Sequence, residues 1–327
     1  MKKTIKTIIT LFLILLILGI AGFLFYLNWI IHAPASSSNQ YQIFEVKKGE
    51  STFLISQRLK NKNLIASDWV FFLNAKFKSK PLATGYYNLS PNMTMLDIFN
   101  RISSGDTNIV KVTIPEGYRA EQIAEVLDEK GVVSYESFLA AAKQYEGKLF
   151  PDTYFFPTGL SINDVVKTMT DDFAERIKAL NVSDEDLIIA SIVEREAVKD
   201  EERPLIAGIY KNRMAINMKL EADPTVQYGK DNLSIKSLSG DDLLNFKFWK
   251  SITSADYQAV DSSYNTYLIS GLPPAPICNP GIKSIEGTIN YSKHKYLYFL
   301  QNDGNIYPSE TLEGHNKNRR DVLGVKK

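Results

Sequence analysis

The N-terminal segment constrains the chain most, because it contains an uncharged run long enough to cross a membrane. Residues 7–31 are 25 consecutive residues without a charged side chain, and about 20 apolar residues suffice for a spanning helix. Three lysines within the first six residues favour the cytoplasmic side, whereas Tyr26 and Trp29 suit the opposite interface. We therefore predict a cytoplasmic tail over residues 1–6, a single transmembrane helix over residues 7–31 and an extracytoplasmic remainder at the cell membrane.

A cleaved signal peptide is the alternative interpretation of this run. The run is longer than the apolar part of a signal peptide, and no convincing small-residue cleavage site follows it directly. We therefore expect a retained anchor. The polar, Ser-rich residues 32–40 that follow predict a linker that lifts the rest of the chain off the membrane.

The remaining residues exclude several classes of function. The net charge falls from +1 to −2 when the three N-terminal lysines are left out, which excludes a nucleic-acid binder with a broad basic surface. Cys278 is the only cysteine, so an intrachain disulfide and a thiolate metal cluster are excluded. The three histidines show no spacing typical of a metal site or of a Ser-His-Asp relay. We expect no metal and no cofactor, so carboxylates must carry most of any chemistry.

An internal repeat follows the linker. The sequence FEVKKG at residues 44–49 matches VTIPEG at residues 112–117, and apolar positions then recur with an offset of 68 residues. Each unit predicts a strand, a Gly turn, an amphipathic helix and a second helix that begins at Ser67 or Ser134. Residues 85–105 between the two units predict another strand, turn and helix.

The first unit resembles a LysM-type module, a small β and α fold that binds glycan chains containing N-acetylglucosamine. The resemblance covers about residues 41–80, and we assign residues 41–110 to a LysM-like module. Glycan binding and a purely structural role, in which the module spaces the active site, are equally open.

Residues 183–218 place one carboxylate where the pattern predicts burial. Ser183 and the three acidic residues after it are a typical helix start. The next turns are apolar almost all round, as in a core helix, and Glu194 continues an apolar face because it lies seven residues after Leu187. Burial raises the pKa of a carboxyl toward the range of a general acid at neutral pH. Pro204 then suits the first turn of a second helix.

Two other interpretations of this segment stay open. Buried carboxylates are usually paired, so Glu194 could instead form a structural salt bridge. Three arginines follow closely in the sequence: Arg195, Arg203 and Arg213. Glu196 is a second candidate acid, but it points roughly 200° around the helix from Glu194. We expect Glu196 to face the acidic residues that follow and to be solvated.

Polar and aromatic residues downstream supply candidate substrate contacts. Residues 146–157 predict a rigid loop or an edge strand. Residues 220–229 predict a polar turn, in which Asp223 is a second candidate carboxylate or a cap, and residues 230–259 predict an irregular surface excursion. A Pro- and Gly-rich loop over residues 262–281 would fix side chains suited to sugar hydroxyl and acetamido groups. The candidate substrate contacts are Asp223, Thr225, Tyr264, Asn265, Thr266 and Tyr267. The C-terminal residues predict two strands around an Asp-Gly turn and a final helix.

Five motifs in this order resemble the YceG-like (MltG) family of endolytic murein transglycosylases: IASIVEREA, ERPLIAGIYKNRM, LEADPTVQYG, YNTYLISGLPPAPICNPG and IYPSETLEGHN. The resemblance spans about residues 112–316, and we assign residues 111–327 to the transglycosylase domain. It implies a lyase, anchored in the cytoplasmic membrane, that cuts nascent peptidoglycan strands internally, and its catalytic Glu falls on Glu194. It also implies peptidoglycan synthases, the penicillin-binding proteins, as membrane partners. The expected fold is α+β, with a single N-terminal transmembrane helix, a small LysM-like module and a mixed α/β catalytic domain.

The implied reaction needs one carboxylate. Glu194 would protonate the glycosidic oxygen between N-acetylmuramic acid and N-acetylglucosamine. It would then remove the proton of the muramoyl C6 hydroxyl, which attacks C1 and closes a 1,6-anhydro ring that limits strand elongation. Two alternatives remain open. One is a muramidase-type hydrolase that uses Glu194 and Asp223, and the other is a non-catalytic, anchored glycan-binding scaffold of the wall-synthesis machinery.

Overall fold

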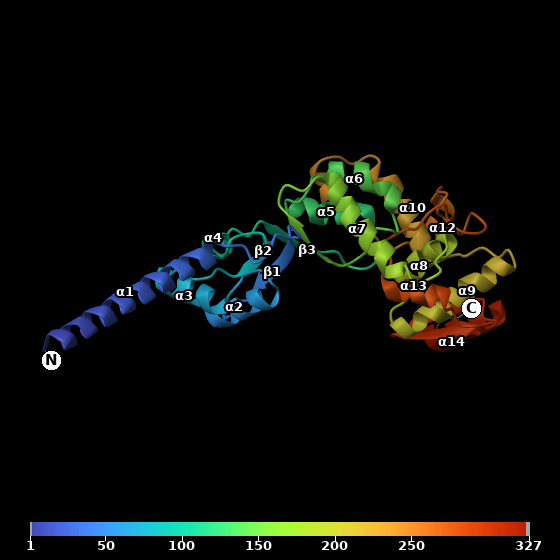
Figure 1. Cartoon of the computed structure of the whole chain (residues 1–327). Helices are drawn as coiled ribbons and strands as arrows, with labels where there is room; N and C mark the ends of the chain where they lie inside the picture. Colours follow the sequence, from blue (N-terminus) through green and yellow to red (C-terminus); the bar gives the residue numbers. More distant parts are fainter. Residues whose placement is uncertain (1, 325–327) are drawn as a thin grey trace. The chain divides into compact units, whose positions relative to one another are not determined.

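A computed structural model describes residues 2–324 and divides them into two compact units. The first unit holds the chain up to Lys111 together with Phe155–Thr158, and the second holds Val112–Tyr154 and the chain from Gly159 onward. Both units combine helices with short strands (Figure 1). The predicted mixture of helix and sheet is therefore confirmed.

The N-terminal helix belongs to the first unit. Among the described residues one helix, α1 (Lys2–His32), is long and apolar enough over Ile9–His32 to cross a membrane, as an anchor or a signal sequence does. Near its end, Ile30 is only 7% exposed and belongs to the core of the unit, with Leu27 and Ile31 packed against that core. The last turns of α1 are therefore part of the folded unit.

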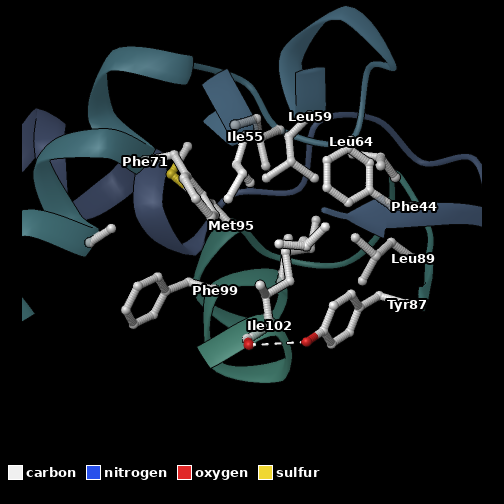
Figure 2. Packing of buried hydrophobic residues seen from close by; sticks show 14 of the residues in the cluster. Phe44, Ile55, Leu59, Leu64, Phe71, Tyr87, Leu89, Met95, Phe99 and Ile102 are labelled. Carbon is white, nitrogen blue, oxygen red and sulfur yellow. Dashed lines mark hydrogen bonds between the residues drawn. The ribbon is translucent and has the colours of Figure 1, made fainter. Parts of the chain in front are cut away.

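A two-stranded antiparallel sheet lies on this core. β1 (Gln42–Val46) pairs with β2 (Gly85–Leu89), and the register sets Phe44 opposite Tyr87. Both side chains are fully buried, because alternate residues of each strand point to the same face. Figure 2 shows these rings packed among the aliphatic side chains of the helices, and the Tyr87 hydroxyl donates a hydrogen bond to the Ile102 carbonyl.

Three helices complete the first unit. They are α2 (Thr52–Asn61), α3 (Asp68–Lys78) and α4 (Met95–Ser104). Each helix begins directly after a Ser or Thr whose side chain accepts a backbone N–H of the first turn, which satisfies one of the unpaired donors there. The strands and helices predicted for residues 44–105 are confirmed, whereas the LysM identity of the module stays a prediction.

The second copy of the repeat begins with the last residues of the first unit and continues into the second. It consists of β3 (Ile109–Thr113), α5 (Ala120–Glu129) and α6 (Tyr135–Ala142). Gly49 and Gly117 occupy equivalent turns and have φ of 79° and 76°, a backbone conformation that favours glycine. The predicted strand, Gly turn and helix pair therefore occur twice.

Of the rigid loop or edge strand predicted for residues 146–157, the structure has a strand at the C-terminal end of the segment. β4 (Thr153–Pro157) pairs with β3 in a two-stranded sheet, and α7 (Ile162–Ile177) follows. Two short 3-10 helices also occur in the second unit: Lys143–Tyr145 and Asp200–Glu202.

Three helices form the centre of the second unit. α8 (Asp184–Glu196) begins with the predicted capping box, in which Ser183 and Asp186 bond reciprocally. α9 (Arg203–Ala215) has Pro204 in its first turn, as predicted. α13 (Ile282–Ile289) packs against both α8 and α9 (Figure 1).

Two predictions about the following residues are wrong. Residues 220–229 are not a turn, because α10 (Asp223–Ile235) begins there with Pro224 in its first turn. The segment 230–259 is not simply a surface excursion, because Asp231 is buried and Trp249 packs on the protein core. The cause is the fully buried Arg119, whose guanidinium lies 3.7 Å from Asp231 and over aromatic rings of this segment, since a buried cation needs such partners. Two short helices lie farther along: α11 (Asp241–Leu244) and α12 (Asp256–Ala259).

The C-terminal part folds as predicted. β5 (Tyr298–Asn302) and β6 (Asn305–Ser309) form an antiparallel hairpin around Asp303 and Gly304. Both turn residues have positive φ, 50° and 69°, as this tight turn requires. α14 (Leu312–Leu323) then packs against the hairpin.

Candidate active site

A cavity of about 440 Å³ lies in the second unit and collects side chains from seven separate segments. α8, α9, the start of α10, α12 and the loop that holds Tyr267 contribute one part of the wall, and β5 and α14 contribute another. The residues that line it are Glu196, Tyr210, Arg213, Leu220, Glu221, Asp223, Tyr257, Tyr267, Tyr298, Phe299, Leu300, Leu312, His315, Asn316 and Arg319. Carboxylates and aromatic rings in one hollow suit the binding and cleavage of a sugar chain.

Glu196, the last residue of α8, is the carboxyl of this cavity best suited to act as an acid. Burial raises the pKa of Glu196 to about 7, and the Asp223 carboxylate adds to the rise. The Tyr210 hydroxyl opposes the rise by donating to Glu196 Oε1 at 2.8 Å. The expectation that Glu196 is solvated is therefore wrong: Phe299 and Leu300 of the hairpin line the same cavity, and Gln301 of the same strand donates to the Glu196 carbonyl.

Asp223 lies in the same cavity, held by two tyrosines. The Tyr267 hydroxyl donates to Asp223 Oδ1 at 2.7 Å, and the Tyr257 hydroxyl is 3.5 Å from Oδ2. The two rings stack with centroids 4.0 Å apart and an angle of 11° between their planes. Asp223 is thus fixed in orientation, and both tyrosines beside it line the cavity.

Glu194 is buried, as predicted, but it does not line this cavity. Its side chain is 6% exposed, and both carboxylate oxygens are used within the protein. Oε1 lies 3.2 Å from a guanidinium nitrogen of Arg203, and Oε2 accepts the backbone N–H of Gly281 at 2.9 Å. Arg203 in turn donates to Ser284 of α13. The salt bridge left open by the sequence is therefore present, and through it Glu194 joins α8, α9 and the start of α13.

Three of the predicted substrate contacts are buried in the protein and do not line the cavity: one lies on α10 and two lie in the loop over residues 262–281. Thr225, Asn265 and Thr266 are each 0% exposed. The Asn265 side chain donates to the carbonyls of Tyr257 and Val260, and the hydroxyls of Thr225 and Thr266 lie 2.8 Å apart. These bonds satisfy buried polar atoms and fix the backbone that carries the tyrosines.

The remaining two predicted contacts differ from each other. Tyr267 lines the cavity, as described above. Tyr264 packs instead against Tyr228, with ring centroids 4.6 Å apart, and it is not among the residues that line the cavity. Of the six predicted contacts, Asp223 and Tyr267 are therefore brought together with Glu196.

The rest of the cavity wall was not predicted from the sequence. Tyr257 lies in the segment assigned to a surface excursion, and His315 and Arg319 lie on a mostly polar helix without buried residues. One signal was available: Leu312, His315, Asn316 and Arg319 follow the i, i+3, i+4, i+7 spacing of one helix face. Between residues 2 and 324, no group of three or more His, Cys, Asp or Glu side chains is arranged to hold a metal ion.

Comparisons with known proteins place the chain in a family. A sequence model described as the YceG-like family matches residues 44–321. A Bacillus subtilis protein named endolytic murein transglycosylase is 30% identical over 324 residues, which cover 86% of this chain and 84% of that protein. A Streptococcus pneumoniae D39 protein of the same name is 28% identical, and the match covers 86% of this chain but only 58% of that protein.

A solved structure is also similar. The crystal structure of a yceG-like protein from Listeria monocytogenes aligns with a TM-score of 0.52 and 30% sequence identity, over 86% of this chain and 99% of that chain. The family match covers most of the chain, from the first strand into the last helix. The chain therefore belongs to the YceG-like family.

Proposed function

We propose that this protein is an endolytic murein transglycosylase, which cleaves peptidoglycan glycan strands internally and leaves 1,6-anhydro-muramoyl ends. The names of the relatives support the reaction class. The observation that carries the proposal in this chain is Glu196, a carboxyl with a pKa raised to about 7 in a cavity lined by tyrosines. A carboxyl with such a pKa is partly protonated at neutral pH and can act as a general acid.

The catalytic step follows from one carboxyl. Glu196 gives its proton to the oxygen between the muramoyl C1 and the next sugar, and that bond breaks through an oxocarbenium-like state. The carboxylate that remains takes the proton of the muramoyl C6 hydroxyl, whose oxygen bonds to C1. The proton count of Glu196 is restored and no water is consumed. The stacked rings of Tyr257 and Tyr267 give a sugar ring an apolar surface to lie on.

Glu196 is proposed in preference to Glu194, to which the family resemblance pointed. Both oxygens of Glu194 already have a partner in the fold, Arg203 for one and the Gly281 N–H for the other, and Glu194 does not line the cavity that holds Glu196. The pair Glu196→Gln and Glu194→Gln tests the assignment in the full chain, purified in detergent and incubated with uncrosslinked glycan strands. Loss of anhydro ends with Glu196→Gln, and their persistence with a folded Glu194→Gln, is the expected result; the reverse pattern would return the role to Glu194.

A two-carboxylate hydrolase is the second candidate, and one observation favours it. Asp223 lies in the same cavity as Glu196, so it could activate a water molecule while Glu196 protonates the leaving oxygen. Products with free reducing ends would identify this reaction. The scaffold hypothesis predicts instead that Glu196→Gln leaves the cellular role intact.

We further propose the cellular arrangement that the sequence suggests. α1 anchors the protein in the cytoplasmic membrane with the N-terminus inside, the module over residues 41–110 lies next to the membrane, and the domain over residues 111–327 meets nascent strands outside. Penicillin-binding proteins are proposed as partners because they supply such strands. Tyr264, Thr225, Asn265 and Thr266 are proposed to position the cavity wall, whereas Asp223 and Tyr267 contact the substrate.

A further inference from the structure

One face of α14 lines the cavity and carries polar groups that have no bonding role in the described fold. Leu312, His315, Asn316 and Arg319 lie at i, i+3, i+4 and i+7 and all line the cavity, because this spacing brings side chains to one side of a helix. The helix itself is held by other residues. Asn318, on a different face, donates to the Tyr307 carbonyl of β6.

The two arginines of the cavity differ in what they are bonded to. Arg213 is 8% exposed and donates to the carbonyls of Leu297 and Leu220, so its guanidinium serves the fold. Arg319 is exposed and makes no hydrogen bond or ion pair with any residue between 2 and 324. Arg319 is therefore the cation of this wall that is available to a ligand.

His315 adds a second unused group beside Arg319. Its ring stacks on Tyr298 with centroids 5.6 Å apart, and its Nδ1 is buried without a hydrogen-bond partner among the described residues. Burial, with the charges of Arg319 and Arg213, lowers the pKa of His315, which favours the neutral ring. An unpaired polar atom buried at the edge of a cavity costs free energy, which a ligand can recover.

We propose that the α14 face is a subsite for a carboxylate of the substrate, with Arg319 as its principal ligand and His315 and Asn316 beside it. This inference rests on the proposed function. A glycan strand carries carboxylates in two places. One is the stem peptide, and the other is the lactyl group of a muramoyl residue that has lost its peptide. A guanidinium binds either one through paired N–H donors.

The test compares Arg319→Ala with Arg320→Ala in the full chain in detergent. Arg320 is the matched control, because it is exposed on the same helix but does not line the cavity. The substrates are uncrosslinked strands that bear stem peptides and strands stripped by an amidase. We expect Arg319→Ala to raise KM about tenfold with kcat changed little, and Arg319→Lys to recover part of the loss. An effect on the first substrate alone assigns a peptide carboxylate, and an effect on the second alone assigns the lactyl carboxylate.

Binding separates failure of this inference from failure of the proposed reaction. The same arginine substitutions in a Glu196→Gln background are measured for retention of uncut strands and of a neutral N-acetylglucosamine oligomer. Weaker retention of the anionic strands alone supports the subsite even if the wild-type chain cleaves nothing. Equal retention by the Arg319 and Arg320 variants, or an equal loss for the neutral oligomer, overturns it.

Discussion

At the scale of single residues, two glutamates two positions apart on α8 have opposite surroundings. Glu194 has an arginine and a backbone N–H within hydrogen-bond distance. Glu196 has a tyrosine hydroxyl and the neighbouring charge of Asp223. A carboxyl that is buried near a like charge holds its proton more firmly, and Glu196 has such surroundings. The two glutamates therefore differ in their partners within one turn of helix, which is the basis for proposing Glu196 and not Glu194 as the acid.

The pH dependence of cleavage follows from this difference. Glu196 must be protonated to act as an acid, so kcat/KM is expected to fall as pH rises through about 7. Asp223→Asn removes a charge that raises the pKa of Glu196, and the fall should then occur at lower pH. A pH–rate profile of both proteins checks this. If Asp223→Asn retains activity and its kcat/KM falls at the same pH as that of the wild type, the proposed effect of Asp223 on the pKa of Glu196 is contradicted.

Stability should respond to the same carboxyl. The folded protein raises the pKa of Glu196 above its value in the unfolded chain. The contribution of Glu196 to the free energy of unfolding is therefore complete below the unfolded pKa and is lost as pH rises through about 7. Glu196→Gln has no charge to bury, so its unfolding midpoint is expected to exceed that of the wild type by about 2 °C or more at pH 8. The gain should be smaller at pH 5. Thermal melts of both proteins at pH 8 and pH 5 measure this difference. An equal difference in unfolding midpoint at the two pH values would contradict an origin in the charge of Glu196.

At the scale of elements, the Glu194 salt bridge holds three helices together. Glu194 belongs to α8, Arg203 to α9, and Gly281 and Ser284 to the start of α13. A buried ion pair adds little over an apolar pair, but removing one partner leaves an uncompensated charge.

Arg203→Ala is therefore expected to destabilise the second unit by about 3 kcal/mol, measured by urea unfolding. Glu194→Gln should cost less, because an amide without charge still accepts the Gly281 N–H. In the double variant the two losses should not add, since both remove the same pair. Additive losses would show that the two residues act separately.

The same elements show how far the sequence could predict the fold and the site. The capping box at Ser183 and the Asp-Gly turn at Asp303 are local signals, and the elements they mark are where they were expected. The burial of Glu194 followed from the helix period and is observed. The surroundings of Glu196 could not be predicted, because the hairpin that lines the same cavity lies about a hundred residues later in the chain. The helical period of the sequence predicts which face of a helix a residue occupies, but it does not predict which element packs against that face.

At the scale of the whole molecule, the end of the apolar helix belongs to the first unit. Ile30, Leu27 and Ile31 pack into its core, and a run of about 17 to 25 residues is enough to span a bilayer. In the proposed membrane arrangement, residues 9–26 would therefore lie in the lipid, and the first unit would begin at the membrane surface.

Truncation tests this arrangement. A soluble form that begins at Ala33 loses the buried Ile30 and its neighbours, and loss of one such side chain from a core costs about 2 to 5 kcal/mol. A form that begins at Tyr26 keeps them. The first unit is expected to melt at lower temperature in the shorter form, while both forms retain the second unit. Identical melting of the first unit in the two forms would contradict a structural role for the end of α1.

The reaction itself is tested most directly by the origin of the new chain end. Uncrosslinked strands are incubated with the full chain in water enriched in ¹⁸O, and the products are analysed by mass spectrometry. Because the muramoyl C6 oxygen closes the ring, we predict 1,6-anhydro ends without ¹⁸O, formed by the wild type and not by Glu196→Gln. Reducing ends that carry one ¹⁸O atom would contradict the lyase and identify a hydrolase that uses Asp223 to activate water.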